Sequence, residues 1–447
     1  MDKFIVKGGK KMRGTVNVFG SKNVATKLLV AACLTDEEIV IENLPLISDV
    51  LIMIEIVRHL GGEAKIIDHK LKIRMNKFLS EKISLEKAAE IRPSFMFLAP
   101  LLARKKVAII PNPGGCRIGA RPIDRVIDGL KQMGVKIKYE SKDGYFHALA
   151  PDGLKGTSYK FVKSTHTGTE TMILAATNAK GKTILENAGQ EPEIDELIAL
   201  LNRMGGKIKR DTQNPRRIEI DGVRKLHGAK FIIAPDRNEI VTFACAALAT
   251  RGDIFIENIT KKGIEEFLEL FEKIGGHYEE KNKGIRFYYK GKLKAQDVTT
   301  GYYPGFMTDW QGPWSVVMLK SEGTSILHER VYENRFTYVE DINKMGAEIE
   351  LFNPQVKDPK KYYNFNYKDG KNFFHAARIT GPKELHNAIL NIYDLRAGAT
   401  LVLAALAAQG ESVLLGIEHL DRGYEEFDKR LKKLGANIKR VKEEIYE

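Results

Sequence analysis

The sequence has little cysteine and no long hydrophobic run. Only three cysteines occur among 447 residues, and no two of them form a C-x-x-C pair, which argues against a disulfide framework and against a zinc site. No apolar stretch reaches the length that spans a bilayer, and the opening MDKFIVKGGKK lacks the apolar core of a signal peptide. These absences predict a cytoplasmic protein with no metal ion and no membrane partner.

The charge balance is basic but mixed. The 71 Lys and Arg residues exceed the 58 Asp and Glu residues and give a net charge of +13, which is compatible with nucleic-acid binding. The charges are interspersed, however, and only residues 361–375 approach the alternation of aromatic and basic side chains that single-strand binding uses. A site for small anionic ligands explains the charge equally well, and a basic nucleic-acid-binding repeat protein is kept as a remote alternative.

One short phrase, an apolar residue followed by glycine, a small residue and a β-rich run, recurs six times along the chain. Five intervals separate the copies, and all but the last are roughly seventy residues long. The longer last interval contains a polar, aromatic insertion at about residues 352–376. The first glycines of the six copies are Gly61, Gly134, Gly205, Gly275, Gly346 and Gly435.

Each copy of the phrase follows the same pattern of elements. An amphipathic helix precedes the glycine, a β-rich run precedes that helix, and a helix that is apolar nearly all round lies further upstream. Helices of the last kind belong in the interior of a unit, under sheets. A chain of this length exceeds one ordinary core, so the pattern predicts an α/β protein of six repeats, divided three and three between two domains.

Basic residues stand at the predicted starts of several buried helices, for example Lys22, Arg92 and Arg396. A cation in the first turn of a helix is repelled by the helix dipole. An anion bound there is attracted both by the dipole and by the cation. The positions therefore predict a basic site for a ligand with phosphates or carboxylates, which arginine can bind in bidentate fashion.

The second helices of the repeats carry a similar signal. Arg121 and Arg422 stand at equivalent distances before their glycines, at the expected helix starts, and Arg335 lies nearby in its own repeat. The alternative is that these arginines pair with local acids, because Asp394 and Asp421 are close in sequence to basic residues.

The cysteines fall into two classes. Cys33 and Cys245 lie in apolar helical runs, where a thiol is a small buried hydrophobe. Cys116 lies in NPGGCRIGARPID, where glycines leave it uncovered and Arg117 and Arg121 favour its thiolate. The pattern predicts either a reactive thiol or an incidental cysteine on a surface loop.

Eight motifs together carry a resemblance to a known family. They are GSKN at 20–23, PGGCRIGARPID at 113–124, EPEID at 191–195, PDRNE at 235–239, TDWQ at 308–311, ENRF at 333–336, DLRA at 394–397 and DRGYE at 421–425. In this order they resemble the UDP-N-acetylglucosamine 1-carboxyvinyltransferase family of enolpyruvyl transferases over essentially the whole chain. The glycine-flanked cysteine loop is the most specific of them, because the related family that uses shikimate 3-phosphate lacks it.

The resemblance implies a fold of two domains. It is an inside-out α/β barrel of six βαβαββ repeats, three per domain, with a substrate cleft between the domains. Residues 22–235 would form the N-terminal domain with the cysteine loop. Residues 1–21 would join residues 236–447 in the C-terminal domain.

The resemblance also implies the chemistry. The enolpyruvyl group of phosphoenolpyruvate would pass to the 3-hydroxyl of UDP-N-acetylglucosamine with release of phosphate, at the first committed step of peptidoglycan synthesis for the cell wall. Cys116 would be the general acid, which phosphoenolpyruvate can also capture covalently, and Asp309 the base, with Lys22 and Arg396 beside them. The implied substrate-binding residues are Lys22, Asn23, Arg92, Arg121, Pro122, Ile123, Asp124, Arg125, Thr165, Gly168, Asp309, Val331, Arg335 and Arg422. No cofactor and no metal are implied, and the protein would be a monomer or a weak homo-oligomer.

Three positions depart from the family pattern. Lys27 introduces a charge into the first buried helix, His166 precedes Thr167 and Gly168 near the uridine-contacting strand, and Trp310 follows the predicted base. His166 is either a local hydrogen-bonding group at a helix start, which is the favoured reading, or a nucleotide contact. The departures keep open a different acceptor, such as a variant UDP-sugar or shikimate 3-phosphate.

Overall fold

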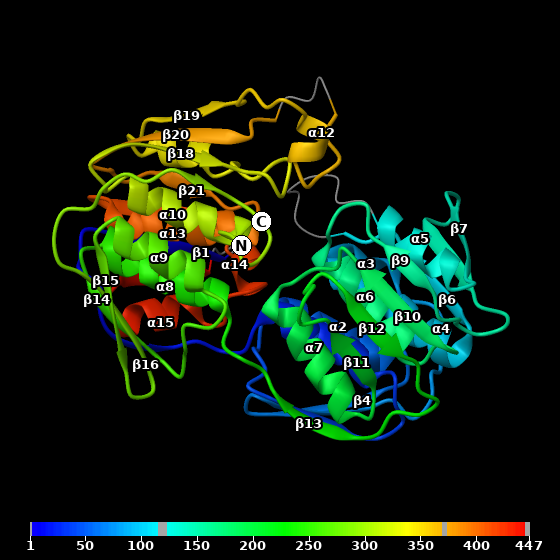
Figure 1. Cartoon of the computed structure of the whole chain (residues 1–447). Coiled ribbons are helices and arrows are strands. Elements are labelled where there is room, and N and C mark those ends of the chain that lie inside the picture. The colour runs from blue at the N-terminus through cyan, green and yellow to red at the C-terminus, as the bar shows by residue number, and fades with distance from the viewer. Residues whose placement is uncertain (1, 115–122, 369–372, 443–447) are drawn as a thin grey trace. The chain divides into compact units, whose positions relative to one another are not determined.

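The computed structural model describes residues 2–114, 123–368 and 373–442 (Figure 1). These residues form two compact units. The central unit comprises residues 19–114 and 123–234, and the terminal unit comprises residues 2–18 and 235–442. Both ends of the chain therefore belong to the same unit.

The central unit contains three of the six sheets that the described residues form. Its strands are β3 (Ile39–Glu42), β4 (Glu63–Ile67), β5 (Lys70–Arg74), β6 (Val107–Pro111), β7 (Lys136–Glu140), β8 (Tyr145–Leu149), β9 (Ser158–Lys160), β10 (Lys182–Glu186), β11 (Lys207–Arg210), β12 (Ile218–Asp221) and β13 (Ala229–Ile232). The strand orders are β13-β3-β5-β4, β6-β8-β7 and β11-β12-β10-β9.

One complete βαβαββ repeat runs from β9 through α6 (His166–Thr177), β10, α7 (Pro192–Arg203) and β11 to β12. Leu185 of β10 lies opposite Tyr159 of the parallel strand β9 and opposite Ile218 of the antiparallel strand β12. In the first repeat of the unit, the parallel partner of β3 is β13, which comes from the far end of the unit. In the second, a parallel bridge between Lys82 and Ile109 takes that place.

The terminal unit contains the other three sheets. Its strands are β1 (Asp2–Lys7), β2 (Arg13–Asn17), β14 (Asp253–Glu257), β15 (Gly276–Lys281), β16 (Gly284–Tyr289), β17 (Val298–Thr299), β18 (Gly323–His328), β19 (Ile349–Phe352), β20 (Ala376–Gly381), β21 (Ile389–Asn391), β22 (Glu411–Leu415) and β23 (Asn437–Lys442). The orders are β15-β16-β14-β2, β17-β18-β20-β19 and β21-β22-β1-β23. The first strand, β1, lies between β22 and β23 and is antiparallel to both, and β2 is parallel to β14.

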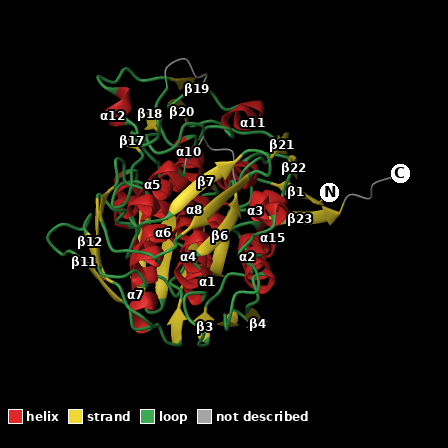
Figure 2. Cartoon of the chain, turned by 90° about the vertical axis from the view of Figure 1, so that its right-hand side faces the viewer, coloured by secondary structure: helices red, strands yellow, loops and turns green. Residues whose placement is uncertain are grey.

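The helices that are apolar nearly all round are buried, as the sequence predicts. In the central unit they are α1 (Lys22–Ala32), α4 (Leu98–Lys105), which follows the short helix η1 (Arg92–Phe97), and α6; in the terminal unit they are α8 (Arg237–Ala249), α10 (Gln311–Met318) and α13 (Leu395–Ala407). Every residue of α8 and of α10 is buried. Figure 2 shows α1, α4 and α6 among the strands of their unit. Within the described residues, no helix is both long enough and apolar enough to cross a membrane.

Cys33, the C-cap of α1, and Cys245 of α8 are fully buried, as predicted. Burial raises the pKa of the Cys33 thiol to about 12 and that of the Cys245 thiol further still. Both thiols therefore remain protonated and act as small hydrophobic side chains.

The amphipathic helices end at the six predicted glycines. These helices are α2 (Ser48–His59), α5 (Asp124–Gln132), α7, α9 (Glu265–Lys273), α11 (Val339–Lys344) and α15 (Phe427–Lys433). All six glycines have φ between 89° and 101°, in the left-handed region that glycine adopts without strain. At the end of α7, for example, the Gly205 N–H donates to Asn202 and the Gly206 N–H to Leu201.

The insertion lies between β19 and β20 and contains the short helix α12 (Pro359–Tyr362). Its aromatic rings pack on one another: the buried Tyr363 stacks on Phe365 and Tyr367, at centroid distances of 4.9 and 5.5 Å, and contacts the ring of His375. Rings that cover one another in this way do not form the open row on which nucleobases stack. The packing therefore weighs against the nucleic-acid alternative.

Candidate active site

In the terminal unit, Asp309 lies in the short helix η2 (Thr308–Trp310), directly before α10. Its Oδ1 accepts a hydrogen bond from the guanidinium of Arg335, which is almost fully buried, and its Oδ2 lies 3.7 Å from Nε of Arg396. The carboxylate itself keeps a quarter of its side-chain surface exposed. Asp309 is thus a solvent-accessible carboxylate held between two buried cations.

Hydrogen bonds to its neighbours fix the Arg335 side chain. Its Nε donates to Thr308 Oγ1 at 3.2 Å, and that hydroxyl donates to Glu329 at 2.9 Å. Its Nη1 lies 3.8 Å from Oδ1 of Asp394. Burial raises the pKa of Glu329, while Arg335 and nearby N–H donors oppose that shift. Arg335 is therefore paired with two carboxylates, Asp309 and Asp394, that lie far from it in the sequence.

Arg396 lies in the first turn of the buried helix α13, whose N-cap is Asp394. Asp394 Oδ1 accepts hydrogen bonds from the backbone N–H groups of Arg396 and Ala397, at 2.9 and 3.0 Å. The Arg396 guanidinium lies 5.3 Å from the centre of the Tyr424 ring, and its Nη1 is buried without a hydrogen-bond partner among the described residues. A buried guanidinium nitrogen without a partner is suited to binding an anion.

Two further predicted residues of this unit have different surroundings. Val331 is buried, and its N–H donates to Glu329 at 2.7 Å. Arg422, which the sequence placed at the start of the second helix, is instead the C-cap of the short helix α14 (Glu418–Asp421). The predicted helix start at Arg422 is wrong, because Arg422 ends α14 and α15 begins only at Phe427.

In the central unit, Lys22 and Asn23 form the first turn of α1, which Ser21 caps through its hydroxyl. The Lys22 ammonium lies 2.8 Å from Asp49, a buried residue in the first turn of α2. This ion pair holds Lys22 at the helix start although the helix dipole opposes it.

The other predicted residues of the central unit also cluster at helix starts. Thr165 caps α6 and accepts a hydrogen bond from the N–H of Gly168. Arg92 begins η1, and Ile123 is the N-cap of α5, followed by the helical residues Asp124 and Arg125. Cys116, Arg121 and Pro122 lie outside the described residues, so their predicted roles stay predictions.

Sequence reasoning missed several partners of these residues. Asp49 is the partner of Lys22, and Thr308 and Glu329 hold Arg335. The sequence offered one signal for Thr308, because it stands directly before the predicted base Asp309. No spacing in the sequence links Glu329 to Arg335. Trp310 proves to be an anchor of η2, because it is buried and its indole N–H donates to Asn238 at 2.9 Å.

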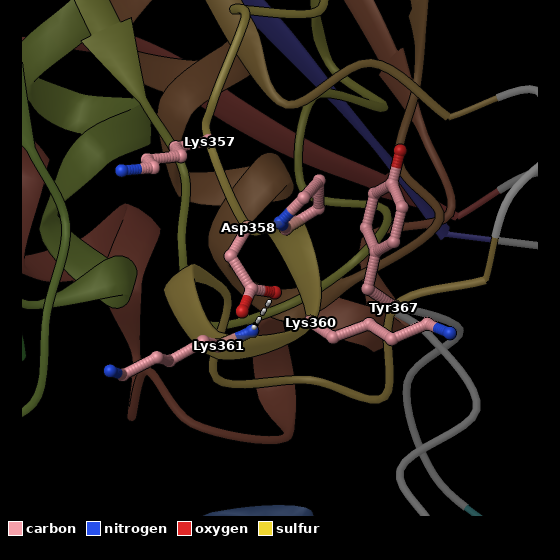
Figure 3. Close-up of a pocket in the computed structure, with 6 residues that line it drawn as sticks. Lys357, Asp358, Lys360, Lys361 and Tyr367 are labelled. Carbon is pink, nitrogen blue, oxygen red and sulfur yellow. Dashed lines mark hydrogen bonds between the residues drawn. The ribbon is translucent and has the colours of Figure 1, made fainter.

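A surface pocket of about 610 Å³ lies in the insertion (Figure 3). In the figure, the Asp358 carboxylate accepts a hydrogen bond from the backbone N–H of Lys361, and this bond caps α12. The lining residues are Lys357, Asp358, Pro359, Lys360, Lys361 and Tyr367. None of them belongs to the predicted site.

Comparisons with known proteins match this chain over nearly its whole length. The family model of EPSP synthase (3-phosphoshikimate 1-carboxyvinyltransferase) matches residues 6–431. Proteins named UDP-N-acetylglucosamine 1-carboxyvinyltransferase from Bartonella henselae and Gluconobacter oxydans are each 37% identical, over 99% of this chain and 100% of the relative. The one from Acidobacterium capsulatum is 38% identical, over 99% of this chain and 96% of the relative.

Solved structures show the same fold. The enolpyruvyl transferase NikO from Streptomyces tendae superposes with a TM-score of 0.85 at 22% identity, over 98% of this chain and 99% of that chain. EPSP synthase from Acinetobacter baumannii superposes with a TM-score of 0.74 at 16% identity, over 99% of this chain and 100% of that chain. The fold is therefore that of the enolpyruvyl transferases.

Among the enolpyruvyl transferases, the full-length relatives identify one family. The chain belongs to the family of UDP-N-acetylglucosamine 1-carboxyvinyltransferases.

Proposed function

We propose that this protein transfers the enolpyruvyl group of phosphoenolpyruvate to the 3-hydroxyl of UDP-N-acetylglucosamine and releases phosphate. The observation that carries the proposal is the full-length identity to relatives of that name. The arrangement of Asp309 between Arg335 and Arg396 supports it, because the reaction needs a carboxylate base beside cations that bind an anionic substrate.

The reaction proceeds by addition and elimination. The 3-hydroxyl oxygen bonds to C2 of phosphoenolpyruvate and loses its proton to Asp309, while the methylene carbon gains a proton from Cys116. The tetrahedral adduct then returns a proton from the same carbon to the Cys116 thiolate as its C2–O bond to phosphate breaks, which leaves the enolpyruvyl ether and free phosphate. The exposed edge of Asp309 supports its role, because a base must be reachable by the hydroxyl.

Phosphoenolpyruvate carries a phosphate and a carboxylate, so its binding needs several cations. We assign this task to Lys22, Arg121, Arg396 and Arg422. The buried Nη1 of Arg396, which has no hydrogen-bond partner among the described residues, supports its part. Arginine can bind either group through two parallel hydrogen bonds.

The acceptor is assigned to the remaining predicted residues. Asn23 would contact the sugar, and the helix starts would bind the nucleotide, since backbone N–H groups there favour phosphate. The residues so assigned are Arg92, Arg121, Pro122, Ile123, Asp124, Arg125, Thr165 and Gly168, with Val331 and Arg335 lining the site. That the reaction opens peptidoglycan synthesis, takes place in the cytoplasm and is carried out by a monomer or weak homo-oligomer remains a prediction.

The test is phosphate release from phosphoenolpyruvate by purified protein, with UDP-N-acetylglucosamine, with other UDP-sugars, with shikimate 3-phosphate and with no acceptor. We expect release with UDP-N-acetylglucosamine and its loss in Cys116→Ser. Cys245→Ser is the matched control, because it makes the same substitution at a fully buried thiol of α8 that has no assigned role. If phosphate is released only with shikimate 3-phosphate or only with another UDP-sugar, that compound replaces UDP-N-acetylglucosamine as the acceptor. If no acceptor gives phosphate release, the proposal is refuted.

A further inference from the structure

The insertion contacts the chain directly after β18, at residues 328–330. Figure 1 shows α12 of the insertion beside that end of the strand. The Glu329 N–H donates to the carbonyl oxygen of His375 at 2.7 Å, and the carbonyl oxygen of Arg330 accepts from the N–H of Asn364 at 2.8 Å. The insertion therefore fixes the backbone of two successive residues.

The side chains of Arg330 and His328 contact the insertion as well. The Arg330 guanidinium donates to the carbonyl oxygen of Tyr362 through Nε at 3.2 Å and Nη2 at 2.9 Å, and it lies 4.2 Å from the centre of the Tyr362 ring. Nε2 of His328 lies 3.2 Å from the Tyr363 hydroxyl, and its ring stacks on that of Tyr362. A guanidinium that makes two hydrogen bonds and stacks on a ring is held in one orientation.

Glu329, which stands between these two residues, contacts the candidate active site instead. Its carboxylate accepts from the Thr308 hydroxyl at 2.9 Å and from two backbone N–H groups. That hydroxyl accepts in turn from Nε of Arg335, which binds Asp309. Because successive side chains of a strand point to opposite sides, the end of β18 carries the insertion on one side and the network of the predicted base on the other.

The fold of the repeat does not require the insertion. In the last repeat of the central unit, β11 and β12 pair in the same order as β19 and β20 do here, and residues 211–217 alone connect them. The connection between β19 and β20 runs from residue 353 to residue 375. Its contacts with residues 328–330 therefore have a purpose other than the pairing of these strands.

We propose that the insertion is a positioning element of the active site and that Arg330 is the positioning residue through which it acts. By holding residues 328–330, it keeps Glu329 and Arg335 in the arrangement that presents Asp309 to the acceptor hydroxyl. The inference rests on the proposed function. A base must lie within hydrogen-bond reach of the proton it accepts, and a displacement of about 1 Å can lower the rate by about a hundredfold.

The first experiment compares turnover and binding in Arg330→Ala. The turnover number, measured as phosphate release at saturating substrates, should fall about tenfold, because Glu329 is no longer fixed. The affinity for UDP-N-acetylglucosamine, measured by calorimetry, should stay within about twofold of the wild type, since the nucleotide sugar is assigned mainly to the central unit. An unchanged binding stoichiometry would show that the loss of turnover does not come from unfolded protein.

The second experiment is a double-mutant cycle that tests whether Arg330 acts through Glu329. Glu329→Gln replaces one carboxylate oxygen with an NH₂ group, so one of its hydrogen bonds is lost, and turnover should fall at least as much as in Arg330→Ala. Adding Arg330→Ala to Glu329→Gln should lower turnover by less than about twofold further, because the same network is already broken. Two effects that multiply in full would overturn the inference, since the residues would then act independently.

A matched arginine of the same sheet serves as the control. Arg378 of β20 lies 4.9 Å from the centre of the Phe352 ring and pairs with Glu350, and both of these partners belong to β19. Arg378→Ala should therefore keep the turnover number of the wild type. Arg330→Lys keeps the charge and one donor to Tyr362, and it should recover part of the loss that Arg330→Ala causes.

The outcomes separate the inference from the proposed function. An active wild type with equal turnover in Arg330→Ala would overturn the inference alone, and so would an equal loss in Arg378→Ala. A wild type that releases no phosphate with any acceptor would overturn the proposed function and the inference with it. If Arg330→Ala fails to fold, Tyr363→Phe removes only the hydroxyl that contacts His328. It should lower turnover without weakening binding, and unchanged turnover would overturn the inference.

Discussion

Both units place buried charges at the starts of buried helices, but they satisfy these charges differently. In the terminal unit, Asp394 caps α13 with two hydrogen bonds, and Glu329 accepts from Thr308 and from two backbone N–H groups. In the central unit, Glu170 is equally buried, yet its oxygens have ionic neighbours and no hydrogen bonds among the described residues.

The difference has a physical consequence. A carboxylate that accepts several well-directed hydrogen bonds is fixed in its position. A carboxylate held only by neighbouring charges depends on the protonation of those neighbours. The terminal network therefore suits the rigid placement of a base, and the central network suits a response to pH.

The largest expected effect concerns the base itself. Asp309→Asn should lower the turnover number by roughly a thousandfold, within the range known for the loss of a general base, because the amide cannot accept the hydroxyl proton. Phosphate release at saturating substrates measures it. Asp152→Asn, which alters an exposed carboxylate paired with Lys155, should leave the rate unchanged. An Asp309→Asn variant with wild-type turnover would exclude Asp309 as the base.

The next effect is on stability and tests what compensates the buried carboxylates Glu170 and Glu329. Lys27→Met should cost about 3 kcal/mol of stability, because it leaves Glu170 buried without its cation. Adding Glu170→Val should restore most of this loss, since that carboxylate accepts no hydrogen bond from the described residues. The double change Arg335→Met/Asp309→Leu should remain destabilised, because Glu329 stays buried without its cation. Denaturant unfolding measures both, and recovery in the terminal pair would contradict the comparison.

The glycines test a feature that the two units share. Gly134→Ala and Gly435→Ala should each cost about 1–2 kcal/mol, the price of placing a side chain in the left-handed region. A Cβ meets little or nothing at either position, so the backbone alone accounts for the loss. Gly291→Ala is the control, because its surroundings are equally open and its φ is not positive. Equal stability of all three variants would refute the explanation.

The smallest effect compares two histidines whose pKa values shift in opposite directions. Burial, with help from Arg330, lowers the pKa of His328 in the terminal unit to about 4, whereas the pKa of His166 is raised. Between the unfolded value near 6.5 and about 4, the unfolded chain binds a proton that folded His328 does not. Stability should therefore fall as the pH falls through this window, by about 1.5 kcal/mol between pH 6.5 and pH 5.

Unfolding at pH 6.5 and pH 5 measures the His328 contribution, and His328→Phe should remove it. His166 should behave in the opposite sense: its contribution is complete below pH 6.5 and is lost as the pH rises through its folded pKa. The same pH dependence in His328→Phe as in the wild type would contradict the assignment.

Much of the fold could be predicted from the sequence, because its signals are local. The six glycines mark helix ends through their own backbone freedom, and the apolar runs around Cys33 and Cys245 identify buried helices. The Arg422 prediction failed for a local reason too: the short helix α14 breaks the equivalence between repeats. Periodicity gives no warning of an added turn of helix.

The candidate site was less accessible to sequence reasoning. The motifs identified Asp309, Arg335 and Arg396 one by one. Their spacing in the sequence did not indicate that both arginines approach the same carboxylate. Lys27 and His166 were noted as separate departures from the family pattern, and Glu170 was not singled out.

The sequence by itself determined the repeats, the helix ends and the types of residue at the helix starts. These depend on side chains and backbone angles within a few positions of one another. The tertiary structure alone decided which carboxylate faces which cation and whether hydrogen bonds satisfy it. Such pairs join different elements, so their energies depend on distance and burial in the folded chain.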